Sequence, residues 1–236
     1  MEKSVFARYE KKYLLTNAQK ESLINRLANY IMCDEYGAYT ISNIYYDTDS
    51  YELIRTSIEN PVYKEKLRLR SYGASAANDM VFIELKKKYN GVVYKRRLTL
   101  PYQQAIQLLH KNTIANNSQI LSEIKHFLSI YSVSEKVFIC YDRIAYTGIH
   151  DQDLRITFDS NIRFRQIALR LDKGTWGDTL LPQDQVIMEI KIPGVFPTWL
   201  SALLSEFKMF PISFSKYGSC YKKFIAGTFL REVRHA

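Results

Sequence analysis

The sequence has few cysteines, few glycines and no long apolar run. The three cysteines, Cys33, Cys140 and Cys220, are odd in number and widely spaced, which excludes a disulfide framework and a paired-cysteine zinc site. Only 9 of the 236 residues are glycine, which is not typical of a disordered or low-complexity chain. No apolar run has the length of a membrane span, and the N-terminus lacks the apolar centre of a signal peptide. We therefore expect a reduced, soluble, cytoplasmic protein.

Several common catalytic motifs are also missing. The sequence contains no Gly-x-x-x-x-Gly-Lys phosphate loop and no arrangement typical of a serine or cysteine triad. The four histidines, at positions 110, 126, 150 and 235, show no metal-ligand spacing. A P-loop enzyme, a nucleophilic hydrolase and a histidine-bound metal site are therefore not expected.

Positive charge is what the sequence has in excess. Lys and Arg number 33 against 24 Asp and Glu, so the net charge is +9. This excess predicts a polyanionic partner, such as nucleic acid, a nucleotide, polyphosphate or an acidic membrane surface. There is no internal repeat, low-complexity tract or flexible linker, so we expect a single domain over residues 1–236.

The clearest charge pattern lies between Tyr63 and Gly73. In a strand, successive side chains point to opposite faces, so Lys64, Lys66, Arg68 and Arg70 would form a cationic row with residues about 7 Å apart. Glu65, Leu67 and Leu69 would lie on the other face. A solvated strand face is one explanation of such a row. The alternative is an anion lying along it, which the recurrence of the pattern in other strands favours.

Period-2 alternation and turn residues predict a chain of strands joined by helices. The Asn90-Gly91 pair predicts a hairpin, and Thr16 with Gln19 predicts a capping box for a helix whose apolar stripe includes Leu27 and Ile31. We expect strands at 4–15, 38–46, 63–73, 80–88, 92–100, 136–147, 154–160 and 186–192, and helices after Thr16 and near 51–54, 101–111, 118–131, 197–207 and 220–231. The fold class is α+β: an antiparallel sheet closed into a barrel, with helices packed outside and a cationic interior.

The charged strand faces supply the candidate functional residues. Arginine gives planar bidentate contacts to phosphate oxygens, whereas lysine acts as a compact point charge. The arginines on these faces include Arg68, Arg70, Arg143 and Arg155, and the lysines include Lys12, Lys86 and Lys95. The few carboxylates on these faces would balance charge or hold Mg²⁺ or Mn²⁺. Glu189 is the strongest metal candidate, and the other carboxylates are Glu10, Glu84 and Asp159.

These residues lie in short motifs that together resemble a known family. The motifs are Arg8-Tyr9-Glu10-Lys11-Lys12-Tyr13, Ile44-Tyr45-Tyr46-Asp47-Thr48, Leu67-Arg68-Leu69-Arg70-Ser71-Tyr72-Gly73, Glu84-Leu85-Lys86, Asp142-Arg143, Leu154-Arg155-Ile156-Thr157-Phe158-Asp159, Met188-Glu189-Ile190-Lys191 and Phe214-Ser215-Lys216-Tyr217. In this order they resemble a bacterial-type VTC domain, the polyphosphate polymerase domain of the vacuolar transporter chaperone complex. The similarity spans nearly the whole chain.

The resemblance implies a fold and an activity. The fold would be that of the triphosphate tunnel metalloenzymes of the CYTH-like superfamily, an antiparallel tunnel of about eight strands. The activity would be transfer of the terminal phosphoryl group of ATP to a growing polyphosphate chain, with Mn²⁺ or Mg²⁺ as cofactor. The expected partners are ATP and inorganic polyphosphate, with no nucleic acid. Any membrane translocation would require a membrane-protein partner.

The resemblance also assigns roles to individual residues. Lys12, Arg68, Arg70 and Glu189 are the candidate catalytic residues, acting by positioning and charge neutralisation. Glu189 would hold the metal, with Glu10 and Glu84 as lesser candidates. The phosphate-binding set comprises Lys12, Lys66, Arg68, Arg70, Lys86, Lys95, Arg97, Arg143, Arg155, Lys191 and Lys216.

Two positions depart from the family pattern. The wider superfamily opens with Glu-x-Glu-x-Lys, but Arg8 occupies the first position here, so only Glu10 and Lys12 match. This substitution favours the polymerase branch over the hydrolytic triphosphatases. Ser213 stands where eukaryotic relatives tend to have a second lysine before Lys216, which predicts weaker binding of the product chain.

Three alternatives to a polymerase remain. A tunnel triphosphatase would hydrolyse inorganic or nucleoside triphosphates at a similar site. A non-catalytic polyphosphate binder would keep the cationic faces and lose the metal site, which the presence of Glu189 disfavours. A nucleic-acid-binding protein would also combine basic strands with tyrosines, but it would expose its cations on an open surface.

Overall fold

The computed structural model describes residues 8–90, 92–111 and 118–227. The strands are β1 (Arg8–Thr16), β2 (Ile31–Asp47), β3 (Tyr63–Tyr72), β4 (Met80–Tyr89), β5 (Val92–Pro101), β6 (Ser134–Gly148), β7 (Arg155–Arg165), β8 (Asp178–Thr179) and β9 (Gln185–Pro193). The helices are α1 (Asn17–Leu27), α2 (Glu52–Ile58), α3 (Tyr102–Lys111), α4 (Gln119–Ile130), α5 (Thr198–Glu206), α6 (Lys216–Cys220) and the π-helix η1 (Tyr221–Ile225). Within the described ranges, no helix combines the length and the hydropathy needed to cross a membrane.

The chain divides into two compact units, each assembled from three separate segments. Unit 1 comprises Met1–Thr40, Tyr141–Ile162 and Leu181–Phe214, and unit 2 comprises Ile41–Cys140, Arg163–Leu180 and Ser215–Ala236. Strands β2, β6 and β7 each contribute residues to both units. The prediction of a single domain over residues 1–236 stays a prediction.

The strands form one nine-stranded sheet in the order β1-β9-β7-β6-β2-β3-β4-β5, with β8 paired to β7. The pairings of β1 with β9, β9 with β7, β2 with β3, β3 with β4 and β4 with β5 are antiparallel. Among the described residues, no hydrogen-bonded pairing joins the end strands β1 and β5. The predicted antiparallel sheet with helices is therefore confirmed, whereas closure into a barrel stays a prediction.

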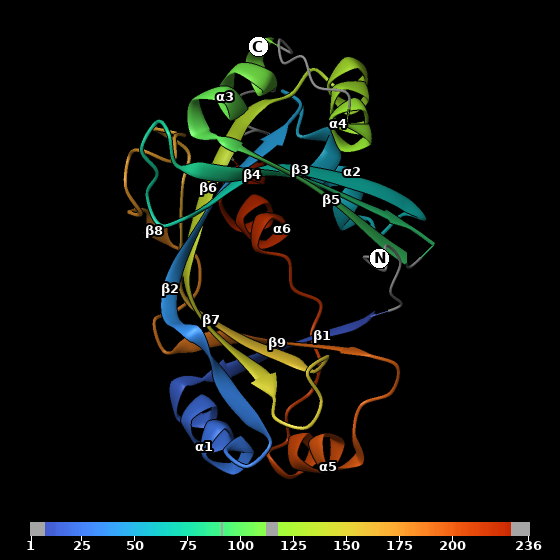
Figure 1. Cartoon of the computed structure of the whole chain (residues 1–236), viewed down its shortest axis with the longest axis vertical. Helices are drawn as coiled ribbons and strands as arrows, with labels where there is room; N and C mark the ends of the chain where they lie inside the picture. The colour runs from blue at the N-terminus through green and yellow to red at the C-terminus, as the bar shows by residue number, and fades with distance from the viewer. Residues whose placement is uncertain (1–7, 91, 112–117, 228–236) are drawn as a thin grey trace. The chain divides into compact units, whose positions relative to one another are not determined.

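Unit 1 buries one face of its strands beneath two helices. Figure 1 shows α1 and α5 on the same side of β1, β9 and β7. The apolar core between these layers includes Tyr13, Leu15, Leu23, Leu27, Ile156, Phe158, Met188, Ile190, Leu200 and Leu203. Because these strand residues alternate with charged ones, the other face of the same strands is polar.

Unit 2 repeats this arrangement with different elements. Helices α3 and α4 cover one face of the β3–β4–β5 layer, and α6 lies on the other side (Figure 1). The apolar core under α3 and α4 includes Leu67, Leu69, Val81, Ile83, Leu85, Tyr102, Ala105, Leu108, Leu121, Ile124 and Phe127. The cationic residues of β3 therefore lie on the face that these two helices leave uncovered.

Local sequence signals predicted most of the elements and missed some of their ends. The capping box is confirmed, since Thr16 Oγ1 accepts from Gln19 N at 3.2 Å and Gln19 Oε1 accepts from Thr16 N at 2.9 Å. The predicted stripe wrongly extended this helix to Ile31. The helix ends at Leu27, where a turn with Tyr30 N donating to Leu27 O at 2.8 Å leads into β2.

Two further boundaries differ from the prediction. Strand β2 begins seven residues before the expected Ala38. The prediction missed these residues because they are largely exposed and show no period-2 pattern. The predicted helices include none over 214–217, but Ser215 caps α6 and Lys216 begins it. The predicted hairpin pairs β4 with β5 as expected, although Gly91 lies outside the described residues, as does the end of the predicted helix 220–231.

Candidate functional site

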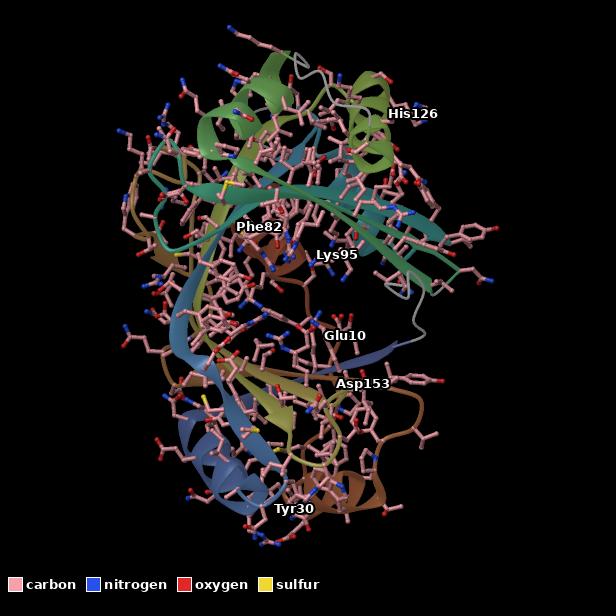
Figure 2. The ribbon with its side chains drawn as sticks, viewed as in Figure 1. Glu10, Tyr30, Phe82, Lys95, His126 and Asp153 are labelled. Atoms are coloured by element: carbon pink, nitrogen blue, oxygen red, sulfur yellow. The ribbon has the colours of Figure 1, made fainter. Side chains whose placement is uncertain are left out.

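The cationic face of unit 2 is formed by six side chains on β3, β4 and β5. Strand register aligns them in rows: Lys66 lies opposite Lys86, which lies opposite Lys95, and Arg68 lies opposite Glu84, which lies opposite Arg97. Arg70 follows two residues after Arg68 on the same face. Figure 2 shows that Phe82 and Lys95 lie on the side of the layer away from α3 and α4. The structure thus brings together Lys66, Arg68, Arg70, Lys86, Lys95 and Arg97.

Glu84 is the centre of this face. Its Oε2 contacts Arg68 Nη2 at 2.7 Å and Arg70 Nε at 3.6 Å. Its Oε1 contacts Lys95 Nζ at 2.7 Å and Arg97 Nη2 at 2.6 Å. One buried carboxylate therefore holds four cations, and four positive charges less one negative charge leave three unbalanced. An anion bound to this face would offset that excess.

Electrostatics keep Glu84 ionised. Burial by itself would raise its pKa, but the attraction of Arg68, Arg70 and Lys95 lowers the pKa well below the ordinary value. Glu84 is 1% exposed, and both of its oxygens are engaged by cations. The surroundings therefore suit a charge-balancing carboxylate, and they do not favour Glu84 as a metal ligand.

Uncharged side chains orient the cations of this face. Arg68 Nη1 donates to Tyr45 Oη at 3.2 Å, and Arg70 Nε donates to Asn43 Oδ1 at 2.9 Å. Lys66 Nζ donates to Ser215 Oγ at 3.2 Å. A charge pattern does not identify these three partners, because their side chains are uncharged. Tyr45 and Asn43 could have been found by their spacing of two residues on β2.

Lys95 is a lysine of this face whose pKa is shifted towards neutrality. Burial of its ammonium group, together with repulsion from Arg97 and Arg70, lowers the pKa of Lys95 to about 8, although Glu84 pulls in the opposite direction. Lys95 is therefore mainly protonated at pH 7 and loses its charge as the pH rises through about 8.

The polar face of unit 1 carries the remaining predicted residues of the strands. Glu10 lies opposite Lys191, which lies opposite Arg155, and Lys12 lies opposite Glu189. Figure 2 shows Glu10 on the side of β1 away from α1 and α5. Within this face, Lys12 Nζ lies 3.1 Å from Glu10 Oε1, and Lys191 Nζ lies 2.6 Å from Glu189 Oε1.

Two arginines of this face differ in how firmly they are held. Arg143 forms a bidentate pair with buried Asp159, with Nε donating at 2.6 Å and Nη2 at 2.8 Å. Arg155 is half exposed and lies 3.9 Å from Asp34. Arg143 is thus pre-positioned, while Arg155 keeps donor groups accessible to a ligand.

Two oxygen-bearing side chains lie side by side on this face. Thr157 lies directly opposite Glu189 in the β7–β9 pairing. Both are largely buried, and Thr157 Oγ1 has no hydrogen-bond partner. A buried hydroxyl without a partner is uncommon and calls for an explanation. An oxygen-binding cation or its water would supply one, since magnesium binds through one or two protein oxygens, substrate phosphates and water.

In the described ranges, including the surroundings of Glu189, no three Asp, Glu, His or Cys side chains gather as a metal-binding group. Glu189 as a metal ligand therefore stays a prediction, with the hydroxyl of Thr157 lying across from it. Thr157 was missed as a candidate because a hydroxyl adds nothing to a charge pattern. The side chain of Arg8, at the departure from the superfamily pattern, lies outside the described part of the structure.

Lys216 lies on a helix, whereas the other predicted phosphate-binding residues lie on strands. It is the first residue of α6, between the cap Ser215 and buried Tyr217. Two surface pockets of about 320 and 450 Å³ are lined by other residues. Residues of α5 and β1, together with Phe196 and Met209, line the first, and residues of α3 with Arg170 line the second. Neither pocket contains a member of the predicted site.

Comparisons with known proteins identify a family and solved structures of similar fold. The family model described as VTC domain matches residues 7–225. A comparison with curated proteins gives no significant match. A Bacillus halodurans protein described as a candidate adenylate cyclase is similar in structure, with 15% identity, a TM-score of 0.57 and coverage of 94% of this chain and 99% of that chain.

A second solved structure of similar fold comes from Hippeastrum. That protein is described as a candidate adenylyl cyclase with a dominant triphosphatase activity. It has 16% identity and a TM-score of 0.53, and the match covers 90% of this chain and 94% of that chain. At these identities the two likenesses show a shared fold.

Proposed function

The chain belongs to the VTC-domain family, and on that premise we propose that it is an ATP-dependent polyphosphate polymerase. The reaction would transfer the terminal phosphoryl group of ATP to the end of a polyphosphate chain. The observation that carries this proposal is the cationic face of unit 2, where four cations surround the single buried carboxylate of Glu84. Such a face is complementary to a chain of phosphates, which carries several negative charges in a row.

The residues of the two faces would act by positioning and by neutralising charge. In phosphoryl transfer, little covalent chemistry is left to the protein, and electrostatic stabilisation of the transferring group dominates. Arg68 and Arg70 would bind neighbouring phosphates, because they lie two residues apart on one strand face. Lys12, Arg143, Arg155 and Lys191 would serve the same purpose on unit 1.

Mn²⁺ or Mg²⁺ fits this proposal as a cofactor. Glu189 would hold the ion, and the unpartnered Thr157 hydroxyl would bind either the ion or one of its waters. The ion, when bound, would neutralise charge on the phosphate oxygens. Lys191, which pairs with Glu189 in the free protein, would then be released to contact phosphate.

We further propose that the sheet closes into the tunnel that the family resemblance implies. The support is the family membership together with the antiparallel strand order. Each unit carries one charged strand face, namely the polar face of unit 1 and the cationic face of unit 2. Both faces carry residues of the same predicted phosphate-binding set.

A tunnel triphosphatase is the second candidate, and the cationic face fits it equally well. The supporting observation is the structural likeness to the Hippeastrum protein, which is described as having a dominant triphosphatase activity. Both reactions need a bound triphosphate and a metal. They differ in whether the terminal phosphoryl group is passed to another phosphate chain or to water.

The product of the reaction tests the proposal. Purified protein would be incubated with ATP and Mn²⁺, and separately with tripolyphosphate and Mn²⁺. We expect long-chain polyphosphate and ADP from ATP. Free phosphate without chain growth would select the triphosphatase, and binding of polyphosphate without turnover would select the non-catalytic binder. Glu189→Gln serves as the control for contaminating enzymes.

The titration of Lys95 predicts a pH dependence of ATP binding. Because the pKa of Lys95 is lowered to about 8, the affinity of the wild-type protein for ATP should fall several-fold between pH 7 and pH 9. Lys95→Arg should keep its affinity over this range, since arginine stays charged. Calorimetry at constant ionic strength would measure both, and the ratio of the two proteins cancels the titration of ATP itself.

The stability of the free protein should change in the opposite direction. Lysine in an unfolded chain has a pKa of about 10.4, so the unfolded state binds more protons than the folded state between about pH 8 and that value. The contribution of Lys95 to the free energy of unfolding should therefore rise with pH in this window.

Equal loss of ATP affinity by wild type and Lys95→Arg would contradict the assignment of the pH dependence to Lys95.

A further inference from the structure

A buried carboxylate at the end of β2 makes contacts that the proposed reaction does not use. Asp47 is fully buried, and its Oδ1 accepts from the backbone N–H of Thr48 at 2.8 Å and of Leu53 at 2.9 Å. Its Oδ2 accepts from Ile54 N at 3.0 Å. The bonds from Leu53 and Ile54 tie the carboxylate to the first turn of α2, and the bond from Thr48 holds the residue that follows Asp47. A fourth bond comes from a distant part of the chain.

The fourth donor is the hydroxyl of Tyr217 on α6, at 2.9 Å from Asp47 Oδ2. Tyr217 is 2% exposed. Burial and the nearby charge of Asp47 raise the pKa of Tyr217, so the phenol remains a neutral donor. The Asp47–Tyr217 hydrogen bond therefore fastens α6 to the junction of β2 and α2. We call it the Asp47–Tyr217 lock.

The ring of Tyr217 connects the Asp47–Tyr217 lock with Arg68 of the cationic face, through contact with Tyr45. It stacks on the ring of Tyr45, with centroids 4.8 Å apart and an interplanar angle of 24°. The hydroxyl of Tyr45 accepts the hydrogen bond from Arg68 Nη1. The guanidinium of Arg68 also lies 6.0 Å from the centre of the Tyr45 ring. The position of Tyr217 thus limits where Tyr45, and through it Arg68, can lie.

A second connection runs through the beginning of α6. Ser215 Oγ accepts from Gly218 N at 3.2 Å as the helix cap and also accepts from Lys66 Nζ at 3.2 Å. A Cβ placed on Gly218 would lie 3.3 Å from the Cβ of Ser215 and 3.8 Å from Ile58 Cγ1. The helix is therefore closely packed between its own cap and α2. Holding α6 in place also holds the oxygen that Lys66 contacts.

We propose that Asp47 and Tyr217 are positioning residues for phosphate binding. They touch no substrate themselves. Through Tyr45 they orient Arg68, and through α6 they place Ser215, Lys66 and the adjacent Lys216. This inference rests on the proposed function in one respect, namely that the cationic face of unit 2 binds a chain of phosphates.

A purely structural role would produce a different result from a positioning role. A buried hydrogen bond between a tyrosine and a carboxylate stabilises a fold wherever it occurs. Unit 2 contains a second bond of this kind, from Tyr46 Oη to Glu135 Oε1 at 3.1 Å. Tyr46 is adjacent to Tyr45 in sequence, is also 2% exposed, and packs in the core with α3 and α4. Tyr46→Phe is therefore the matched control for Tyr217→Phe.

The test compares the binding of tripolyphosphate by wild type and the two Tyr→Phe variants in calorimetry at fixed salt. Both variants should show a fall in melting temperature, because each loses a hydrogen bond from a buried tyrosine to a carboxylate. Only Tyr217→Phe should weaken the binding of tripolyphosphate, about three- to tenfold. Asp47→Asn, which keeps the shape and weakens the acceptor, should change binding in the same direction.

A double variant shows whether Tyr217 acts through Arg68. If it does, the loss of tripolyphosphate affinity in the double variant Arg68→Ala, Tyr217→Phe should be smaller than the sum of the losses in the two single variants. Additive losses, or equal weakening by Tyr46→Phe and Tyr217→Phe, would overturn the positioning role. Unchanged binding in a folded Tyr217→Phe would overturn it while leaving the proposed function intact. If wild type itself fails to bind tripolyphosphate, the proposed function and this inference are both wrong.

Discussion

Glu84→Gln should lower the free energy of unfolding by about 3–5 kcal/mol. The substitution keeps the shape of the side chain and removes the charge that Arg68, Arg70, Lys95 and Arg97 share. These cations would then repel one another on a face where no protein carboxylate replaces Glu84. Urea unfolding of the free protein at neutral pH measures the loss.

Glu123→Gln is the matched control for this prediction. Glu123 pairs with a single arginine, Arg96, at 3.0 Å, and both side chains are partly exposed. Partly exposed pairs contribute less than about 1 kcal/mol. If Glu84→Gln cost no more than Glu123→Gln, the carboxylate would not be the charge centre of this face.

Two conditions should reduce the effect of Glu84→Gln. Tripolyphosphate should raise the melting temperature of the variant by more than it raises that of wild type, because bound phosphates supply the missing negative charge. At acid pH the free energies of unfolding of wild type and Glu84→Gln should become more similar. The pKa of Glu84 is lowered in the folded protein, so its contribution is present above the ordinary glutamate pKa of about 4.3 and is lost as the pH falls further.

Glu189→Gln should reduce metal-dependent turnover of ATP by roughly a hundredfold or more, with the fold retained. The variant keeps the side-chain shape and its pairing with Thr157 across β7 and β9. It loses the charge that would hold the divalent ion. Steady-state rates over a range of Mn²⁺ concentrations measure the effect. The control is Glu206→Gln on α5, which removes an exposed ion pair with Arg26 on α1.

A different outcome is expected if Glu189 only balances the charge of Lys191. In that case Glu189→Gln would keep its turnover and its dependence on Mn²⁺, and the assignment as a metal ligand would be wrong. Arg70→Ala adds a comparison with unit 2. Loss of ATP affinity in Arg70→Ala would indicate that the cationic face of unit 2 takes part in substrate binding.

The alternating strands were predictable from the sequence because their signal is local. In β3, each residue that was placed on the apolar face is buried, and Leu67 and Leu69 have no exposed surface. Strand geometry alone sends alternate side chains to opposite faces. The helix that begins after Thr16 was likewise predicted from a cap and its partner three residues apart.

The wrong predictions of element boundaries concern segments where local sequence signals and tertiary packing differ. Ile31 continues a helical stripe in the sequence, yet it begins β2 and is buried there with the same core. Both positions satisfy its hydrophobicity, so spacing alone could not choose between them. The cap function of Ser215 was missed because polar residues such as serine suit links and helix caps equally well.

The sequence by itself determined which side chains are available: the cationic faces, the few carboxylates among them and the order of motifs that marks the VTC-domain family. Only the tertiary structure decided how they pair. Strand register set Glu84 between two arginine-bearing strands, and it set Thr157 beside Glu189. Asp47 and Tyr217 meet although 170 residues separate them. Such pairings depend on the packing of distant segments, and no pattern with a period of a few residues can encode them.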